Sequence, residues 1–386
     1  MKLKFNNGKF VILQVSDAQD LQFVRHTMIR MLNKAYDTVK PDLVVFTGDN
    51  ILGNHLRDAR FGSKKVVHTK LGELERMKTA INHIIAPVEQ RGIPFAMLYG
   101  NHDDMNWITK DEQADIYRSY TMCRGLDNPD KSVDCDTYNM PIYSSDGEKI
   151  AYNIWMMDTA WKDKEEDKCY TGVKKEAVEW YKRTSDELKE QNGGKVVPSL
   201  MFQHIPTPQC EDLMEECKKT DEGAVRAFRD GEEERYVRLN RNKADGFLGE
   251  PIMGYDIDNG QFEAVKEKGD VQAIVLGHEH MNNYIGVTQG VKIVQSSAAS
   301  FRCYGDKLRG VRVFVLDEND LSDFNTYFLT YNEICGKNLF TELAYIWDAD
   351  GEGKKKAALI AGAGVAAVAV TAAAVSCAKK KKGDKK

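Results

Sequence analysis

Short apolar runs recur along the chain and predict a sheet-rich α/β protein. Runs rich in valine, isoleucine and phenylalanine between polar or turn residues are typical of strands. Helical patterns separate the early runs: apolar residues recur at helical spacing over 24–39 and 74–88, and a third helix is expected at 174–191. Strand and helix alternate at first, and consecutive strands follow, which predicts layered α/β with mixed sheets. The strand candidates are residues 10–16, 43–48, 94–100, 151–158, 199–204, 273–278, 291–297, 311–317 and 326–331.

Two long polar segments interrupt this pattern. Residues 104–148 and 206–260 show no apolar periodicity, and the second is dense in glutamate, lysine and arginine. Irregular stretches of this length are usually functional loops or lids, and a solvated insertion is the alternative. We expect solvated insertions here, without a motif that identifies a substrate.

The C-terminal end differs in composition from the rest of the chain. Residues 357–378 carry no charge, eleven of the 22 are alanine, and lysines flank them on both sides. A helix of about 20 apolar residues can cross a bilayer. The segment therefore predicts a transmembrane anchor; an alanine-rich helix lying on protein and a disordered tail are the alternatives. The expected parts are a catalytic domain at 1–340, a linker at 341–356, the anchor at 357–378 and a basic tail at 379–386.

The N-terminus and the charge distribution bear on location and partners. Residues 1–17 lack the long apolar core of a signal peptide, so we expect a membrane-anchored protein with a cytoplasmic catalytic domain. Residues 354–386 hold nine lysines and one acid, which leaves 45 basic and 58 acidic residues, a net charge of −13, in the remainder. A nucleic-acid-binding protein presents a basic face instead. We predict no nucleic acid and no protein partner; the C-terminal helix would bind the membrane.

Five strand candidates end in residue types that bind metals. In open α/β sheets, sites form beyond the carboxyl ends of strands, so residues far apart in sequence can meet there. Glycines precede three of these positions and allow the backbone to turn tightly. The residues at the strand ends are Asp17, Asp49, Asn101 with His102 and Asp103, His204 and His278.

His278 and His280 lie one residue apart in the run VLGHEH. Residues two apart on an extended segment point the same way, so both imidazoles can face one cavity. Imidazole, carboxylate and amide oxygen donors together suit Zn²⁺, Fe or Mn²⁺. The donors are too many for one tetrahedral ion and suit two divalent ions that share a carboxylate. The six candidate donors are Asp17, Asp49, Asn101, His204, His278 and His280.

The motifs that hold these donors resemble, in their order, those of the calcineurin-like metallophosphoesterase superfamily. They read SDAQ, GDN, GNHD, QH and GHEH, and the resemblance spans about residues 8–330. GDNILG and GHEHMNNY are similar to a branch of small single-domain, purple-acid-phosphatase-like phosphoesterases. The resemblance implies a four-layer αββα sandwich with two mixed β-sheets, formed by one catalytic domain.

The resemblance also implies how the donors share two metal ions. Asp49 would bridge the two ions, and Asp17 and His280 would hold the first. The second ion would be held by Asn101, His204 and His278. Two such ions can bind a hydroxide between them, polarise phosphoryl oxygens and favour in-line attack.

Two further roles and two departures follow from the same resemblance. His102 would contact the phosphoryl oxygens or protonate the leaving group, and Asp103 would orient its imidazole. Gln19 stands where the family usually has histidine, and it is either a metal ligand or a group behind the ligands. Leu52 stands where purple acid phosphatases place a tyrosine, so a tyrosine–iron site is not expected.

The sequence thus predicts a metal-dependent phosphoesterase that acts on a phosphate ester with Mn, Zn or Fe. Monoesters and diesters are not distinguished. The alternative is a membrane-tethered binding or scaffold protein on a degenerate phosphoesterase fold, which Gln19 alone supports. His55, Asn282 and Tyr304 follow the motifs closely and are candidate substrate contacts, although an ordinary loop residue is the preferred reading of His55.

Overall fold

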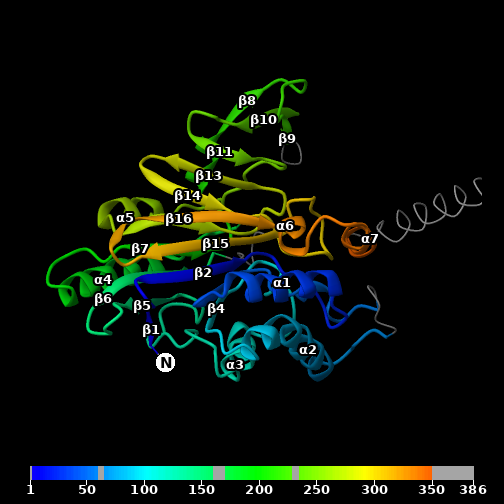
Figure 1. The fold of residues 1–386 in the computed structure, drawn as a ribbon, viewed down its shortest axis with the longest axis horizontal. Coiled ribbons are helices and arrows are strands. Elements are labelled where there is room, and N and C mark those ends of the chain that lie inside the picture. Colours follow the sequence, from blue (N-terminus) through cyan, green and yellow to red (C-terminus); the bar gives the residue numbers. More distant parts are fainter. Residues whose placement is uncertain (1, 60–64, 160–169, 228–233, 350–386) are drawn as a thin grey trace, which may run out of the picture.

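A five-stranded mixed sheet carries the first half of the site (Figure 1). The computed structural model of the protein describes residues 2–59, 65–159, 170–227 and 234–349. Three parallel strands, β2 (Lys9–Val15), β3 (Leu43–Thr47) and β4 (Phe95–Leu98), are connected through helices α1 (His26–Val39) and α2 (Lys70–Glu89). Strand β15 (Gly310–Asp317) pairs antiparallel with β2 and with the edge strand β16 (Asp320–Thr330).

An eight-stranded mixed sheet carries the second half of the site. Its central strands β6 (Ile150–Met157), β7 (Ser199–Gln203), β12 (Val271–Leu276) and β14 (Val291–Gln295) are parallel. Their apolar, β-branched sequences suit strands that are buried on both faces. The strands toward the two edges are β1 (Leu3–Lys4), β5 (Tyr138–Tyr143), β13 (Asn283–Thr288) and β11 (Ala244–Phe247).

Alternating side chains of the larger sheet divide between two cores. Phe202 belongs to the core between the sheets, where its ring centroid lies 5.8 Å from that of Phe314 on β15. Its neighbour Met201 faces the opposite core, which includes residues of α4 (Lys175–Gln191) and α5 (Gln261–Lys268). This period of two lets one sheet bury both faces. Helices α1 and α2 add to the first core beside the five-stranded sheet, which confirms the predicted α/β fold with mixed sheets.

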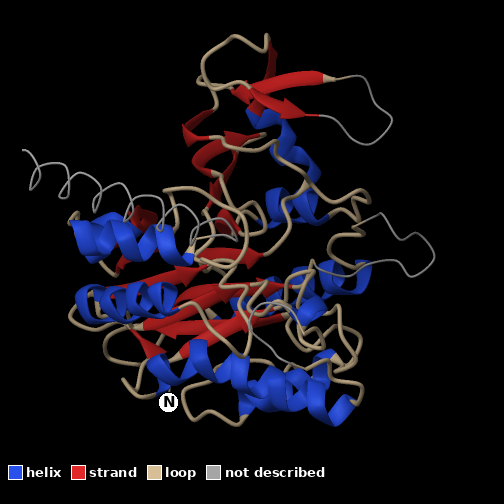
Figure 2. Cartoon of the chain, turned by 90° about the vertical axis from the view of Figure 1, so that its right-hand side faces the viewer, coloured by secondary structure: helices blue, strands red, loops and turns tan. Residues whose placement is uncertain are grey.

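The two polar segments are more ordered than the sequence indicated. Residues 104–148 include α3 (Lys110–Arg118) and β5. Residues 206–260 include the 3₁₀ helix η2 (Pro208–Leu213) and a third, antiparallel sheet, which projects from the body beyond β11 (Figures 1 and 2). The third sheet is formed by β8 (Met214–Cys217), β10 (Arg235–Leu239) and β9 (Val225–Ala227). The prediction of irregular insertions was therefore wrong for these strands, which are too short and too charged to show an apolar period.

The predicted linker begins inside a helix. Helix α6 (Tyr331–Cys335) and helix α7 (Leu339–Asp348) follow β16 and both contact α1. Tyr345 of α7 packs its ring edge-on against Phe301, with 5.2 Å between the centroids. The predicted linker at 341–356 is thus corrected for its first part, because that part packs on the body. Residues 350–356, the predicted anchor at 357–378 and the predicted basic tail at 379–386 lie outside the described residues.

The prediction of a membrane-anchored protein is also corrected. Among the helices formed by the described ranges, none is long and apolar enough to cross a membrane. The prediction had rested on residues 357–378 alone.

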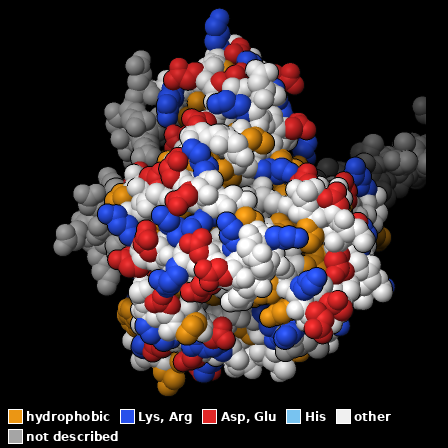
Figure 3. All heavy atoms as spheres, turned by 90° about the vertical axis from the view of Figure 1, so that its left-hand side faces the viewer, with side chains coloured by type: hydrophobic (Ala, Val, Ile, Leu, Met, Phe, Trp, Pro, Cys, Tyr) orange, Lys and Arg blue, Asp and Glu red, His pale blue; other side chains and the backbone are white. Residues whose placement is uncertain are grey.

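On the face of the molecule seen in Figure 3, acidic and basic side chains are interspersed.

Candidate metal centre

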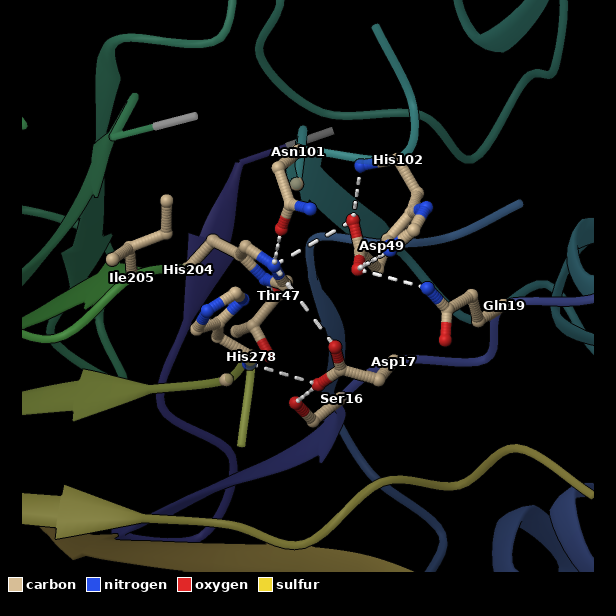
Figure 4. Close-up of polar contacts among 12 residues, drawn as sticks. Ser16, Asp17, Gln19, Thr47, Asp49, Asn101, His102, His204, Ile205 and His278 are labelled. Carbon is tan, nitrogen blue, oxygen red and sulfur yellow. Dashed lines mark hydrogen bonds and ion pairs between the residues drawn. The ribbon is translucent and has the colours of Figure 1, made fainter. Parts of the chain in front are cut away.

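The loops that leave the carboxyl ends of parallel strands from both sheets meet at one place (Figure 4). They bring together all seven side chains predicted to donate to metals. Polar contacts of side chains, a backbone N–H bond from His278 and the packing of its ring on His204 connect these residues into one group, although more than 260 residues separate the first from the last. The group consists of Asp17, Gln19, Asp49, Asn101, His204, His278 and His280. Their role as ligands remains a prediction.

The backbone at the site is strained. Asp17, Gln19, Asp49 and His278 all have positive φ angles, of 49°, 36°, 46° and 72°. Residues with a Cβ rarely adopt this left-handed region, and they cluster at functional sites where the surrounding structure holds them there. At Asp17, Asp49 and His278 the chain turns sharply just after a strand, and the turn directs the side chain of that residue into the site.

Two glycines allow the loops to come close together. A Cβ on Gly100 would lie 2.2 Å from Oδ1 of Asp49, and a Cβ on Gly48 would lie 2.4 Å from Nδ1 of His204. Both distances are too short for any side chain. Glycine at these two positions is therefore needed for the carboxylate and the imidazole to reach the centre.

Asp17 is the most unusual group in the site. Its Oδ2 accepts hydrogen bonds from Ser16 Oγ and from the backbone N–H of His278. Its Oδ1 is buried, has no hydrogen-bond partner within the described residues, and lies 3.6 Å from Nε2 of His280. Burial, together with the negative charge of Asp49, raises the pKa of Asp17 to about 7. One oxygen is thus fixed while the other is positioned to bind a cation.

His280 is held as a neutral imidazole. Its Nδ1–H donates to the backbone carbonyl of Tyr304 at 2.9 Å, and the two rings stack with 4.2 Å between their centroids. Nε2 is therefore left facing Asp17. Burial lowers the pKa of His280 to about 4, so the lone pair is available. Asp17, Asp49 and His280 place one ligand atom each within 4.8 Å of one another.

His204 is oriented in the same way from the other side. Its Nδ1–H donates to the carbonyl of Thr47 at 2.9 Å, while Nε2 lies 3.2 Å from Oδ1 of Asn101 and 3.5 Å from Oδ1 of Asp49. Burial alone would lower the pKa of His204, but the carboxylate of Asp49 raises it to about 9. Carbonyl groups that fix the second nitrogen are the usual support of metal-binding histidines.

His278 completes this side of the centre. Its ring packs edge-on against those of His204 and Tyr170, with 5.1 Å and 5.5 Å between centroids. Burial and the neighbouring His204 lower the pKa of His278 to about 3, so its imidazole is neutral.

Gln19 contacts the carboxylate expected to bridge the ions. Its Nε2 donates to Oδ2 of Asp49 at 3.0 Å. Its Oε1 is buried and has no hydrogen-bond partner in the described part of the chain. Gln19 is thus placed to bind an ion through Oε1 or to hold Asp49 in position through Nε2.

The prediction that Asp103 orients His102 is wrong. The Asp103 carboxylate instead accepts hydrogen bonds from the backbone N–H groups of Asn50, Ile51 and Gly100, at 3.1, 3.0 and 2.8 Å. It therefore joins the loop after β3 to the loop after β4. Burial, with the charge of Asp49, raises the pKa of Asp103 to about 7.

The imidazole of His102 has another neighbour. Its Nδ1 lies 3.3 Å from Oδ1 of Asn54, and its Nε2 lies 4.0 Å from Oδ2 of Asp49. The backbone N–H of His102 donates to Oδ1 of Asp49 at 2.8 Å. The sequence did not single out Asn54, because it lies in a loop between two motifs and carries no spacing signal.

A cavity of about 320 Å³ opens over these groups. Two of the predicted substrate contacts, His55 and Tyr304, line it, and their role stays a prediction. A larger cavity of about 780 Å³ beside α2 and α3 is lined by none of the predicted site residues. The cavity over the centre is lined by Gln19, Asp49, Leu52, Asn54, His55, His102, His278, His280, Arg302, Cys303 and Tyr304.

Asn282, the third predicted substrate contact, is corrected. Its side chain is fully buried. Its Oδ1 accepts from the backbone N–H groups of Gly249 and Glu250, and its Nδ2 donates to Glu279 at 2.7 Å. Asn282 thus attaches the segment 206–260 to the loop of His280.

Glu250, which the sequence did not indicate, connects that segment to the centre. Its Oε1 accepts from the backbone N–H of Met281 at 2.8 Å, and its Oε2 accepts from the hydroxyl of Tyr304 at 2.9 Å. Because Tyr304 stacks on His280, Glu250 supports a predicted ligand through one intermediate residue.

The chain matches the calcineurin-like phosphoesterase family over residues 10–282. A protein of Arabidopsis thaliana named "Probable inactive purple acid phosphatase 29" is 25% identical over 353 residues, which cover 82% of this chain and 79% of the plant protein. Phosphatase DCR2 of Saccharomyces cerevisiae is 23% identical over 299 residues, 72% of this chain and 45% of the yeast protein.

A dimetal phosphatase from Danio rerio has a related structure, with a TM-score of 0.43 and 12% sequence identity over 83% of this chain and 99% of that chain. The family match covers more than half of the sequence and extends from β2 to the loop of His280. The protein therefore belongs to the calcineurin-like phosphoesterase family.

Proposed function

We propose that the protein hydrolyses phosphoric esters with the help of two divalent metal ions. The observation that carries this proposal is Oδ1 of Asp17, which is buried beside Nε2 of His280 and has no hydrogen-bond partner in the described chain. Burying a carboxylate oxygen without a partner is unfavourable unless a cation compensates it. Membership of a phosphoesterase family makes ester hydrolysis the chemistry for which such a cation would serve.

The donor set fits two ions. Asp49 lies between two groups of donors and would be shared by both ions. Asp17 and His280 form one group, with Gln19 as a further candidate donor, and the other consists of Asn101, His204 and His278. Mixed imidazole and oxygen donors suit Mn²⁺, Zn²⁺ or Fe²⁺. When bound, the ions would lower the pKa of coordinated water and neutralise charge on the phosphoryl oxygens.

The chain's own groups prepare the site for that chemistry. Carbonyl groups of Thr47 and Tyr304 hold the Nδ1–H of His204 and His280, so both imidazoles present Nε2 to the centre. His102 lines the cavity above Asp49, where its Nε2–H would be donated to the oxygen of the leaving group.

A second candidate function is ligand binding without turnover on the same fold. Gln19 supports it, because an amide N–H donates to Asp49 where the family usually has an imidazole ligand. Three relatives from Arabidopsis thaliana carry the words "probable inactive" in their names. The same fold would then bind a phosphate ester or a metal ion without catalysing hydrolysis.

The test combines metal analysis with two assays on the full-length protein. The metal-free protein is incubated with Mn²⁺, Zn²⁺ or Fe²⁺, and its bound metal is measured together with hydrolysis of p-nitrophenyl phosphate and of bis-p-nitrophenyl phosphate. We expect about two ions per chain and turnover of at least one ester, which also separates monoesterase from diesterase activity. Metal binding without turnover of any tested phosphate ester would favour the second candidate.

A matched pair of variants shows whether the activity belongs to this site. Asp49→Asn removes the shared carboxylate, and we expect it to lose bound metal and turnover together. Asp37→Asn is the control, since Asp37 lies on the surface in an ion pair with Arg91. Equal activity of the two variants would assign the hydrolysis to a contaminant.

A further inference from the structure

The neutral imidazole of His102 can carry its proton on Nδ1 or on Nε2 unless a neighbouring group selects one of the two tautomers. The nearby carboxylate of Asp103 does not do so, because it accepts hydrogen bonds from two backbone N–H groups of the loop after β3 and from one of its own loop. The backbone N–H of His102 is also used, as a donor to Asp49. The side chain is therefore oriented by whatever lies at Nδ1.

We propose that Asn54 is the positioning residue of His102, an inference that rests on the proposed function. Oδ1 of Asn54 lies 3.3 Å from Nδ1 of His102. An amide oxygen can only accept, so Nδ1 must be the donor in this contact. The proton that the imidazole exchanges is then the one on Nε2, which points toward Oδ2 of Asp49 at 4.0 Å.

The chain places Asn54 by a close backbone approach. Asn54 is the middle residue of a 3₁₀ turn, η1 (Gly53–His55), in the loop that follows Asp49. A Cβ on Gly53 would lie 2.2 Å from the carbonyl oxygen of His102, so only glycine allows the turn to pack there. The Asp103 carboxylate also joins the loop after β4 to the loop after β3, because it accepts hydrogen bonds from the backbone N–H groups of Asn50 and Ile51. Asn54 and His102 are thus held on two loops that are attached to each other.

This arrangement suits proton donation to a leaving group. As the ester P–O bond breaks, its electron pair goes to the leaving oxygen, which takes the proton from Nε2 of His102. A water-derived oxygen forms the new bond to phosphorus. The imidazole keeps its proton on Nδ1, held by Asn54, and Nε2 regains a proton from solvent. Asn54 adds no charge beside Asp49, whereas a carboxylate would.

The kinetic test uses leaving groups of different quality. Asn54→Leu has nearly the same shape but no acceptor, and we expect it to lower kcat by about 10- to 100-fold on alkyl phosphates, part of what a positioned general acid contributes. The loss should be much smaller on p-nitrophenyl esters, whose leaving group needs no proton. Asn54→Asp keeps the acceptor and should retain most of the activity on alkyl esters.

A double-mutant comparison completes the kinetic test. In the His102→Ala background, Asn54→Leu should cause no further loss, because it acts through that imidazole. An equal loss on both classes of ester, or a further loss without His102, would overturn the proposal.

An NMR measurement tests the tautomer of His102 independently of catalysis. In full-length protein with ¹⁵N-labelled histidine at alkaline pH, the His102 resonances, assigned with His102→Gln, should report a proton on Nδ1 and none on Nε2. In Asn54→Leu the two tautomers should mix. A proton on Nε2 in the unmutated protein would refute the role of Asn54 even if the enzyme is active. The expected tautomer without any ester hydrolysis would refute the proposed function alone.

Discussion

Two clusters of buried carboxylates lie in this molecule, and they solve the same electrostatic problem differently. In the candidate metal centre, Asp17 and Asp49 meet neutral or titratable imidazoles, and one carboxylate oxygen lacks a hydrogen bond within the described residues. In the second cluster, between α3, β5 and β6, lysines supply the positive charge. Nζ of Lys110 lies 2.6 Å from Asp158, 3.6 Å from Asp104 and 3.8 Å from Asp136.

Buried carboxylates alone therefore do not indicate a metal site. Asp134 of the second cluster has its own lysine, with 2.7 Å to Nζ of Lys174, and the pKa of Lys110 is raised well above its usual value because the surrounding carboxylates outweigh its burial. In that cluster the positive charges are the side chains of Lys110 and Lys174. In the first cluster, His204 and His280 each donate Nδ1–H to a backbone carbonyl, the arrangement that usually supports metal-binding histidines.

Removing the proposed metal ions from the first cluster should have the largest effect. We expect dialysis of the full-length protein against a chelator to lower ester hydrolysis by at least about 100-fold, since the stabilisation of developing charge is lost. Addition of Mn²⁺ or Zn²⁺ should restore it. The measurement is kcat before dialysis, after dialysis and after reconstitution. Full activity in demonstrably metal-free protein would show that the first cluster does not act through a metal ion.

Removing the cation from the second cluster should affect stability and not metal content. Lys110→Met leaves buried carboxylates uncompensated, and we expect the free energy of unfolding to fall by about 3–5 kcal/mol. Urea denaturation measures this change. Lys9→Met is the control, because Lys9 pairs with Asp317 on the surface. A loss of bound metal in Lys110→Met at unchanged stability would show that the two clusters are not separate.

Weakening the support of one ligand should have a smaller effect. Tyr304→Leu removes both the ring stacked on His280 and the hydroxyl bonded to Glu250. We expect metal affinity to fall by about 10-fold, as for other groups that hold a ligand in place. Competition with a chelating dye measures it. Tyr304→Phe keeps the stack and should lose less; if both variants bind metal like the parent protein, Tyr304 has no positioning role.

The smallest effect concerns protons released on metal binding. Asp17 must be ionised to bind an ion, and its pKa is raised to about 7, so binding below pH 7 displaces a proton and affinity falls as the pH drops. His204, with a pKa of about 9, loses its proton on binding over the whole range below that pH. Calorimetry in buffers of different ionisation enthalpy should therefore find more protons released at pH 6 than at pH 8. Equal release would argue against Asp17 as a ligand.

The sequence predicted the fold well because buried parallel strands leave a plain signal. Apolar runs such as 43–48 and 273–278 are β3 and β12, and helical spacing identified α1 and α2. Motif residues at strand ends were expected to converge, and the structure does bring Asp17 and His278 into contact. Charged strands such as β10 were missed, because only Val237 and Leu239 of its five residues are buried.

Side-chain partners could not be predicted in the same way. Asp103 directly follows His102, yet it faces away, because the turn directs its carboxylate to the N–H groups of two loops. Asn54 lies beside Nδ1 of His102 because it belongs to the 3₁₀ turn η1, and no spacing of residues in the sequence indicates that turn. Asn282 follows the GHEH motif closely but is buried against Glu279. Such details depend on backbone dihedral angles that the residue types leave open.

The most direct test of the account is a crystal structure of the full-length protein grown with Mn²⁺, with anomalous data collected at the manganese edge. We predict two anomalous peaks about 3.5–4 Å apart, with Asp49 between them, Asp17 and His280 on one and His204 and His278 on the other. No anomalous peak beside Asp17, with its Oδ1 turned to a protein donor instead, would contradict the account.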